Sequence, residues 1–446
     1  MVFGYAGASV DFLGGWGQCW DVMTELKDLI LEYGKRARAA ARVLAQLSTE
    51  QKNAALLAMA DQLVAKTEGI LEANKSDLEK AGHSGLTGSM VERLTLSPKR
   101  VQAMADGVRQ VAALEDPVGT VIKEWTRPNG LRISKVRVPI GVIGIIYESR
   151  PNVTSDAAVL CTKTGNATIL RGGSESIQSN VAIAEALQAG AAEAGLPGDS
   201  VLLIPRTDRE AVKHMAEMDK YIDMIVPRGG HQLIETVMEY ARMPVIKHYH
   251  GVCITYVDKD ADLEMAVEVV LNAKTQRPGV CNALETLLVH NGIAESFFAK
   301  AAGRLAEKHV EVRGDETVRE LLGRGSYPYV KEVTEEDYTA EYLDYIMAAK
   351  VVGSAEEATE HIEKYGSHHS DCIVTANEAT AEAFLNGVDS ATVYWNASTR
   401  FTDGAEFGFG AEIGISTDKL HARGPMALEE LTTYKYLIRG TGQVKN

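Results

Sequence analysis

The chain has 446 residues, of which 45% are hydrophobic and 24% are charged, as expected of a globular protein with two or three domains. Its net charge of −15 argues against nucleic acid as the main partner, and no segment has the roughly 20 apolar residues that a membrane-spanning helix needs. Five cysteines stand singly, without the spacing of zinc sites or disulfide frameworks, which indicates a reducing, cytoplasmic compartment.

The first 22 residues differ from those that follow. They are rich in Gly and Trp, show no helical period and lack the basic region of a secretory signal. Helical periodicity starts at Met23, so we predict that the natural chain begins there and that residues 1–22 are a non-native or disordered extension; an ordered arm is the alternative. The chain up to about residue 100 reads as helices, one of them opened by a capping box of Ser48 and Gln51.

Strand signals begin after these helices. Two β-favouring runs flank an Asn-Gly pair at 129–130, which is the strongest short signal for a hairpin. From Val136 to about Val257, apolar strands alternate with helical segments, and a second alternating block starts near His248. Units of this kind predict parallel sheets covered by helices on both faces, so the expected class is α/β with doubly wound domains. The Gly-rich stretch from Asn396 has little periodicity, which is typical of functional or interfacial loops.

Two turns each place two glycines between a predicted strand and a predicted helix. They comprise Arg171, Gly172, Gly173 and Ser174 in the first turn, and Pro227, Arg228, Gly229 and Gly230 in the second. In a parallel sheet, anionic ligands bind at strand C-termini and helix N-termini. Although the chain has no GxGxxG motif, the two turns together predict a dinucleotide site.

Cys281 stands behind a Pro-Gly turn, between a helical segment and an apolar run. A lone cysteine is usually a buried structural thiol. Lys274 and Arg277 are cations nearby in the sequence, and cations favour the thiolate, so a structural thiol and a nucleophile remain open alternatives. Three other cysteines lie in apolar periodic segments and are interpreted as structural: Cys161, Cys253 and Cys372.

Other polar residues of the strand ends are also candidates. Asn152 follows a buried strand, and its amide N–H groups suit an oxyanion, with a plain turn residue as the alternative. Two histidine pairs, His248 with His250 and His368 with His369, are interpreted as loop or solvated residues. No acidic residue or further cysteine near them in the sequence completes a ligand set, so no metal site is predicted.

Three segments, residues 138–175, 226–234 and 274–290, resemble the γ-glutamyl phosphate reductase family of the aldehyde dehydrogenase superfamily. The resemblance runs from about Met23 to the end of the chain. It implies an aldehyde dehydrogenase-like fold with two doubly wound α/β domains and a small β oligomerisation arm. The implied parts are a cofactor-binding domain over residues 23–247, interrupted by a hairpin at 122–136, a catalytic domain over 248–395, and a substrate loop, arm and tail over 396–446.

The resemblance also implies an activity, the NADPH-dependent reduction of L-glutamyl 5-phosphate to L-glutamate 5-semialdehyde and phosphate in proline biosynthesis. Cys281 takes the place of the superfamily's nucleophile, and Asn152 takes that of its oxyanion donor. The glycine turns would hold the cofactor, and Ser174 stands where NAD-preferring relatives carry glutamate, which favours NADPH. Implied partners are glutamate 5-kinase, as a separate pathway protein, and further copies of the chain.

Within the resemblance, His248 stands where aldehyde-oxidising relatives carry a glutamate base, which fits the reductive direction. The substrate has two anionic ends, and we expect Arg150 at the phosphate and Ser398, Thr399 and Arg400 at the amino-acid end. For Arg400, a surface or interface role is an equal alternative. An aldehyde-oxidising dehydrogenase on the same fold and a catalytically silent scaffold remain alternative functions.

Overall fold

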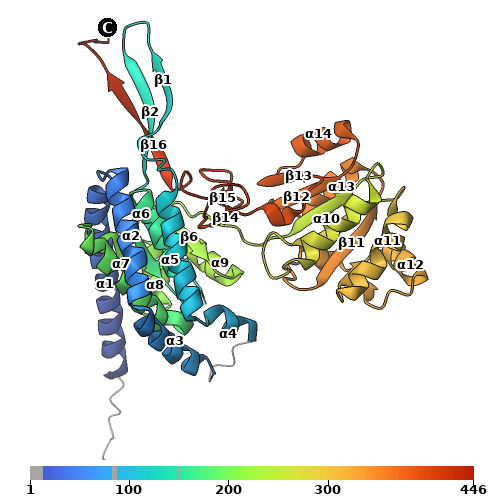
Figure 1. Ribbon diagram of the computed structural model, residues 1–446, viewed down its shortest axis with the longest axis horizontal. Coiled ribbons are helices and arrows are strands. Elements are labelled where there is room, and N and C mark those ends of the chain that lie inside the picture. Colours follow the sequence, from blue (N-terminus) through green and yellow to red (C-terminus); the bar gives the residue numbers. More distant parts are fainter. Residues whose placement is uncertain (1–13, 83–87, 149, 446) are drawn as a thin grey trace, which may run out of the picture.

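The computed structural model describes residues 14–82, 88–148 and 150–445, and the expectation for residues 1–13 lies outside this part. Two lobes are joined side by side, and a three-stranded arm projects from the first lobe (Figure 1). Contrary to the expectation for residues 14–22, helix α1 (Gly14–Leu44) already begins at Gly14. Extending an existing helix adds a hydrogen bond per residue and needs no new nucleus. A natural start at Met23 remains a prediction.

The first lobe surrounds a four-stranded sheet with helices. The helices after α1 are α2 (Thr49–Ala65), α3 (Thr67–Gly82), α4 (Gly88–Leu94), α5 (Pro98–Ala113), α6 (Val153–Lys163), α7 (Ile177–Glu193), α8 (Glu210–Ala216) and α9 (His231–Tyr240), with 3-10 turns η1 (Ser174–Ser176) and η2 (Gly198–Ser200). The strands are β3 (Val142–Tyr147), β4 (Ala167–Arg171), β5 (Val201–Leu203) and β6 (Met224–Arg228). Ser48 and Gln51 form the predicted capping box at the start of α2. None of the described helices, in this lobe or the other, is long and apolar enough to cross a membrane.

The strand order of the first sheet, β5-β4-β3-β6, creates a switch point between β3 and β6. The chain runs outward from β3 to β5 and then returns to β6, and all neighbouring strands are parallel. Right-handed crossovers place α6 and α7 on one face and α8 on the other, where α8 packs against α1. The loops after β3 and β6 therefore border the crevice in which such sheets bind ligands.

The second lobe holds a seven-stranded parallel sheet in the order β10-β9-β11-β8-β7-β12-β13. Its strands are β7 (Cys253–Val257), β8 (Leu284–His290), β9 (Glu311–Gly314), β10 (Val330–Glu332), β11 (Ile346–Val352), β12 (Ser370–Val374) and β13 (Thr392–Trp395). Its helices are α10 (Leu263–Thr275), α11 (Ala294–Glu307), α12 (Glu316–Arg324), α13 (Ala355–Tyr365) and α14 (Glu378–Gly387), with η3 (Glu335–Thr339). A separate apolar cluster lies on each face of the sheet. The prediction of two doubly wound sheets is confirmed.

The C-terminal stretch returns to the first lobe. After η4 (Thr399–Phe401), strands β14 (Gly414–Ser416) and β15 (Gly424–Met426) pair antiparallel. Ile413 and Leu431, at either end of this segment, are buried in the core of the first lobe. The expected grouping of residues 396–446 as loop, arm and tail is therefore corrected, because apolar side chains between 413 and 431 complete the first core.

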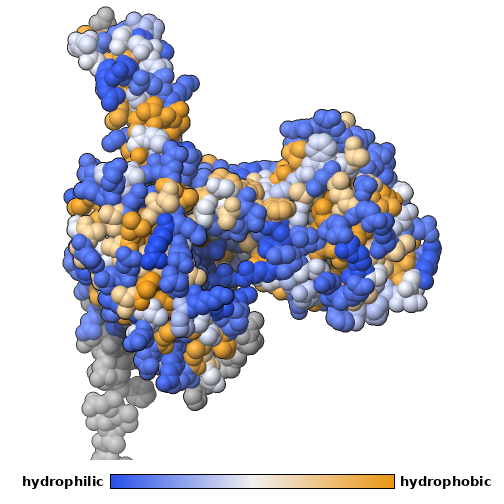
Figure 2. Space-filling view, viewed as in Figure 1, coloured by the Kyte–Doolittle hydropathy of each residue, from blue (hydrophilic) through white to orange (hydrophobic). Residues whose placement is uncertain are grey.

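The arm combines the predicted hairpin with the end of the chain. Strands β1 (Val121–Thr126) and β2 (Arg132–Pro139) pair antiparallel around the turn at 129–130, as predicted. Strand β16 (Thr432–Arg439) pairs with the other edge of β2. Tyr434, Tyr436 and Ile438 on β16 are exposed, and Figure 2 shows apolar surface at the base of the arm. An apolar surface of this kind is suited to contact with another chain.

A buried ion pair joins α10 to β8 and spans the loop that carries Cys281. Lys274 Nζ lies 2.7 Å from Glu285 Oε2 and donates to the Leu284 carbonyl oxygen at 2.8 Å. Both charged side chains are fully buried. Burial disfavours charge, so it lowers the pKa of Lys274 and raises the pKa of Glu285 to about 7. The pair holds the two ends of the loop together.

Replacing Lys274 by methionine is expected to destabilise the second lobe by about 3–5 kcal/mol, the usual effect of leaving a buried charge without its partner. Because the folded-state pKa of Glu285 is raised, stability is retained at low pH and lost as the pH rises through about 7. Urea unfolding at pH 5.5 and pH 8 measures both effects. The matched control is the exposed Lys308→Met; equal midpoints for the two variants would contradict the assigned role.

Candidate active site

Cys281 lies between the two lobes, in the loop that connects α10 to β8. His248, which precedes β7, and His369, which precedes β12, lie beside it. The amino ends of β7, β8 and β12 therefore meet at Cys281. From the first lobe, Arg150 and Arg228 at the carboxyl ends of β3 and β6 act electrostatically on the same site. Figure 2 shows a hollow surface between the lobes. The carboxyl ends of strands in the first sheet therefore face the amino ends of strands in the second sheet across Cys281.

The backbone of Cys281 is fixed by close packing against Gly251. A Cβ atom at Gly251 would lie 2.0 Å from the Cys281 carbonyl oxygen and 2.5 Å from its Cα. The Cys253 thiol donates to the same carbonyl oxygen at 3.2 Å. On the other side, Asn282 donates to the Thr402 carbonyl oxygen at 2.8 Å. Only glycine at position 251 leaves room for this arrangement.

The thiol of Cys281 is half-buried, whereas the three cysteines interpreted as structural, Cys161, Cys253 and Cys372, are buried. Desolvation raises the pKa of Cys281 to about 11, and Arg228 opposes this shift while Glu341 adds to it. The expectation that Lys274 favours the thiolate is wrong, because Lys274 is fully buried and paired with Glu285. The free protein therefore keeps this thiol protonated at neutral pH.

Two histidines from different sequence pairs flank the thiol. His248, Cys281 and His369 each have a ligand atom within 4.8 Å of the other two. As expected, both histidines lie in loops, but they are not solvated, since His369 is fully buried and His248 is half-buried. Burial lowers the pKa of His248 to about 4 and that of His369 to about 3, so both rings are neutral at pH 7. Only the fold brings the two histidines together.

Asn152 precedes helix α6 and is exposed. One N–H of its side-chain amide donates to Asp156 Oδ2 at 2.8 Å. Desolvation raises the pKa of Asp156 to about 6, and the bond from Asn152 opposes that shift. An asparagine amide has two N–H groups, so the contact orients Asn152 and leaves its second donor available.

Arginines gather around the predicted phosphate end of the site. Although Arg150 is exposed, desolvation lowers its pKa, and the charges of Arg228, Arg93 and Arg277 lower it further. Arg93 comes from α4 and reaches the loop of Cys281, where its guanidinium is 3.9 Å from the Cβ position of Gly279. Sequence reasoning missed Arg93, which lies far from the recognisable segments. Among the described residues, Arg93, Arg150 and Arg277 have no ion-pair partner.

The predicted substrate loop divides into two kinds of residue. Arg400 is partly exposed, and its Nε donates to Gln276 Oε1 at 3.0 Å. Desolvation and the charge of Arg277 lower its pKa, and Cys281 opposes this shift. Thr399 is fully buried and donates to the Asn282 carbonyl oxygen at 2.8 Å, and Ser398 is buried and caps η4. Thr399 and Ser398 thus support the cysteine loop, which corrects the expectation that they contact substrate.

The two glycine turns lie at the carboxyl ends of β4 and β6, as predicted, but local packing explains several of their residues. A Cβ at Gly172 would lie 2.1 Å from Asn180, and one at Gly173 would lie 2.5 Å from Glu175. Gly229 is similarly close to the Glu148 carboxylate, which also accepts the Gly230 N–H at 2.9 Å. Phosphate at this helix N-terminus would have to displace Glu148.

The remaining turn residues differ in their exposure. Pro227 is buried within β6. Arg171 is buried, donates to the Thr207 carbonyl oxygen at 3.0 Å, and leaves its buried Nε without a partner. Ser174 is exposed, and its hydroxyl lies 3.2 Å from Glu175 Oε2. Arg228 faces Cys281 as well as the glycine turn, so its charge acts directly on the thiol.

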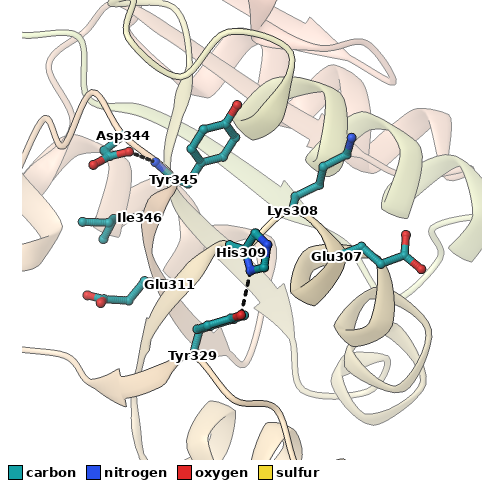
Figure 3. Close-up of a pocket in the computed structure, with 8 residues that line it drawn as sticks. All are labelled: Glu307, Lys308, His309, Glu311, Tyr329, Asp344, Tyr345 and Ile346. Carbon is teal, nitrogen blue, oxygen red and sulfur yellow. Dashed lines mark hydrogen bonds between the residues drawn. The ribbon is translucent and has the colours of Figure 1, made fainter. Parts of the chain in front are cut away.

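A second depression lies elsewhere on the second lobe. Figure 3 shows His309 bonded to the Tyr329 hydroxyl at 2.6 Å, with Glu307, Glu311 and Asp344 around an open pocket. None of the predicted site residues lines this pocket. It lies beside β9 and β11, at the sheet edge that also carries Cys281, but it contains no cysteine or arginine, so the chemistry is assigned to the hollow between the lobes.

Sequence and structure comparisons with known proteins all point to the aldehyde dehydrogenase family. The sequence matches the aldehyde dehydrogenase family over residues 21–319. γ-Glutamyl phosphate reductase from Moorella thermoacetica is 56% identical over 412 residues, which are 92% of this chain and 97% of that protein. The crystal structure of γ-glutamyl phosphate reductase from Thermotoga maritima is 48% identical, covers 94% of this chain and 100% of that one, and has a TM-score of 0.91. An acetylating aldehyde dehydrogenase from Geobacillus thermoglucosidasius shares the fold, with a TM-score of 0.68 at 19% identity over 95% of this chain and 99% of that one.

Replacing Gly251 by alanine is expected to push the Cys281 backbone out of place, because the new methyl group would overlap its carbonyl. A displacement of about 1 Å at a reacting group can reduce turnover by about 10²-fold. The matched control is Gly279→Ala in the same loop, where the nearest atom is 3.7 Å away. Turnover numbers of the two variants, compared at saturating substrate, test the constraint. Equal turnover would contradict it.

Alkylation of Cys281 by iodoacetamide is expected to be slow at pH 7 and to rise about tenfold per pH unit up to pH 9.5, because only the thiolate reacts and the pKa is about 11. Mass spectrometry of the peptide that contains Cys281 measures the rate. A rate that levels off below pH 8 would show that the thiol is more acidic than the surrounding charges indicate.

Proposed function

The chain belongs to the aldehyde dehydrogenase family and, within it, to the γ-glutamyl phosphate reductases, and from this premise we propose that it reduces L-glutamyl 5-phosphate to L-glutamate 5-semialdehyde and phosphate. The observation that carries the proposal is the position of Cys281. It is the half-buried thiol between the two sheets, and the arginines beside it have no ion-pair partner within the described part of the chain. The reaction belongs to proline biosynthesis.

Cys281 acts as the nucleophile. Its sulfur attacks the γ-carbonyl carbon, a C–S bond forms, and the C–O bond to phosphate breaks. Neither neighbouring histidine is basic enough to hold the thiol proton, since their pKa values are about 4 and 3. The proton therefore leaves with the product as hydrogen phosphate. The second N–H of Asn152 and the Cys281 backbone N–H stabilise the oxyanion.

A nicotinamide cofactor follows from family membership, and the first lobe fits it. The switch point between β3 and β6 borders the site, and the orphaned Nε of Arg171 is a free donor at the end of β4. When bound, the reduced nicotinamide would supply a hydride to the thioester carbon. The C–S bond then breaks, the aldehyde leaves, and the Cys281 sulfur takes a proton from water. We assign Arg171, Ser174 and the backbone of the glycine turns to its adenosine half.

NADPH is the proposed form of the cofactor. Ser174 is exposed and uncharged, so it leaves room for a 2′-phosphate. The carboxylate of Glu175 lies 3.2 Å from the Ser174 hydroxyl and has to turn away when a 2′-phosphate binds. Arg171 then offsets the remaining negative charge.

Arginines hold the two anionic ends of the substrate. Arg150 binds the phosphate, with Arg93 and Arg277 close enough to share its charge. Arg400, across the cysteine loop, binds the α-carboxylate, for which a guanidinium offers two parallel N–H donors. His248 stands where oxidising relatives carry a glutamate base. A neutral imidazole does not activate water against the thioester, so the acyl group is retained for reduction.

The proposal extends to partners and compartment. Labile glutamyl phosphate requires a separate glutamate 5-kinase as the pathway partner. The exposed apolar side chains of β16 support a homo-oligomer in which arms meet. Four cysteines are free thiols, which supports a reducing cytoplasm: Cys161, Cys253, Cys281 and Cys372.

Phosphate-dependent reduction of NADP⁺ by pyrroline-5-carboxylate, the cyclised aldehyde, is the direct assay. Wild-type protein is expected to require phosphate, because the acyl phosphate is the product in this direction. Cys281→Ala is expected to retain NADPH binding, measured by fluorescence, and to lose more than about 10³-fold in rate, since no covalent step remains. Oxidation of the aldehyde without phosphate would favour an ordinary aldehyde dehydrogenase instead.

Ser174→Glu is expected to raise the KM for NADPH at least tenfold while leaving the KM for NADH within about twofold, because a carboxylate there would repel a 2′-phosphate. The exposed Gln178→Glu, at the start of α7, adds the same charge farther along and serves as the control. If the wild type uses NADH as well as NADPH, Ser174 does not select the cofactor.

A further inference from the structure

His248, Cys281 and His369 form a three-residue cluster, here called the Cys-His cluster, whose ligand atoms all lie within 4.8 Å of one another. The residues come from three loops, before β7, before β8 and before β12, and specific contacts hold each loop in place. Gly251 packs on Cys281, Asn282 bonds to Thr402, and Thr392 Oγ1 bonds to Ser370 Oγ at 2.7 Å. The cluster therefore sits on fixed backbone.

Each imidazole has one nitrogen in a hydrogen bond, and the other can bind a metal in the tautomer whose proton is on Nδ1. His248 Nδ1 is 2.8 Å from the Ile415 carbonyl oxygen, which only accepts, so Nδ1 carries the proton and Nε2 keeps its lone pair. His369 Nδ1 bonds to the Ser370 hydroxyl at 2.8 Å, and its buried Nε2 has no hydrogen-bond partner. A backbone carbonyl on the far nitrogen is the usual support of a metal-binding histidine.

We propose that the Cys-His cluster binds Zn²⁺ or a similar borderline-soft divalent ion through the Cys281 sulfur and the Nε2 atoms of His248 and His369. Zinc takes cysteine and histidine ligands in tetrahedral geometry, and its bond lengths imply ligand atoms about 3.3–3.6 Å apart. The ligand atoms, within 4.8 Å of one another, thus have to approach by up to about 1.2–1.5 Å. Three protein ligands leave a fourth position for water.

The charged groups around the cluster limit and support this site. Arg228 acts on Cys281 and His248 and opposes a dication, whereas Glu341 and Glu412 also act on Cys281 and offset that charge. Binding forms a Zn–S bond, and the thiol proton is released to water. The ion would then occupy the sulfur lone pair that attacks the acyl phosphate. Metal binding does not depend on the proposed reaction, but inhibition by the metal rests on it.

Metal binding is tested with Co²⁺ as a spectroscopic probe and Zn²⁺ as the ligand, on the full chain freed of metal with EDTA. Wild-type protein is expected to show a thiolate-to-cobalt absorption band that Zn²⁺ removes. His369→Asn keeps a polar atom where Nδ1 meets Ser370 but lacks Nε2, and is expected to bind Zn²⁺ at least tenfold more weakly. His309→Asn, an exposed histidine of the same lobe, is the control and should match the wild type.

A folded wild type without the cobalt band, or equal Zn²⁺ affinity in wild type and His369→Asn, would overturn the proposal. If His369→Asn does not fold, Zn²⁺ protection of Cys281 against iodoacetamide at pH 8.5 decides the question in the wild type. Protection reversed by EDTA supports the site, and its absence refutes it. A protein that binds the metal through Cys281 but reduces no acyl phosphate would sink the reductase proposal and leave this site standing.

Discussion

The buried pair of Lys274 and Glu285 is the interaction on which the active-site geometry depends. It closes the loop of Cys281 at the point where α10 ends and β8 begins, 2.7 Å between charged atoms with no solvent access. A buried ion pair contributes little net stability compared with apolar packing, yet losing one partner is costly. The role of the pair here is to fix the two ends of the Cys281 loop, so that the Cys281 backbone packs against Gly251.

Facing sheet edges explain how one thiol collects groups from distant parts of the chain. The first sheet contributes the carboxyl ends of β3 and β6, where loops carry Arg150 and Arg228. The second sheet contributes amino ends, so Cys281 and His369 precede their strands. A search at strand carboxyl ends alone therefore finds the glycine turns of the first sheet and misses His369 beside Cys281.

The electrostatics of the site keep the Cys281 sulfur in its less reactive, protonated form. Desolvation keeps the Cys281 thiol and both histidines neutral, so the free protein presents a protonated sulfur among uncharged rings. In the proposed binding mode, the positive charges of Arg150 and Arg400 meet the two anionic ends of the substrate. An acyl phosphate brings its own good leaving group, so a site of this kind needs neither a strong base nor a water-activating carboxylate.

The sequence by itself determined the local elements and, through three recognisable segments, the family. Alternation of apolar strands and helices, the Asn-Gly hairpin, the Ser48 capping box and the cysteine motif are short-range patterns that backbone physics and side-chain type decide locally. Tertiary structure alone decided which charges and rings surround Cys281. Lys274 is buried in an ion pair with Glu285 and does not face the thiol. Arg93, on α4, lies beside the Cys281 loop, and His248 lies beside His369. Solvation and proximity depend on how distant segments pack, and no spacing along the chain encodes them.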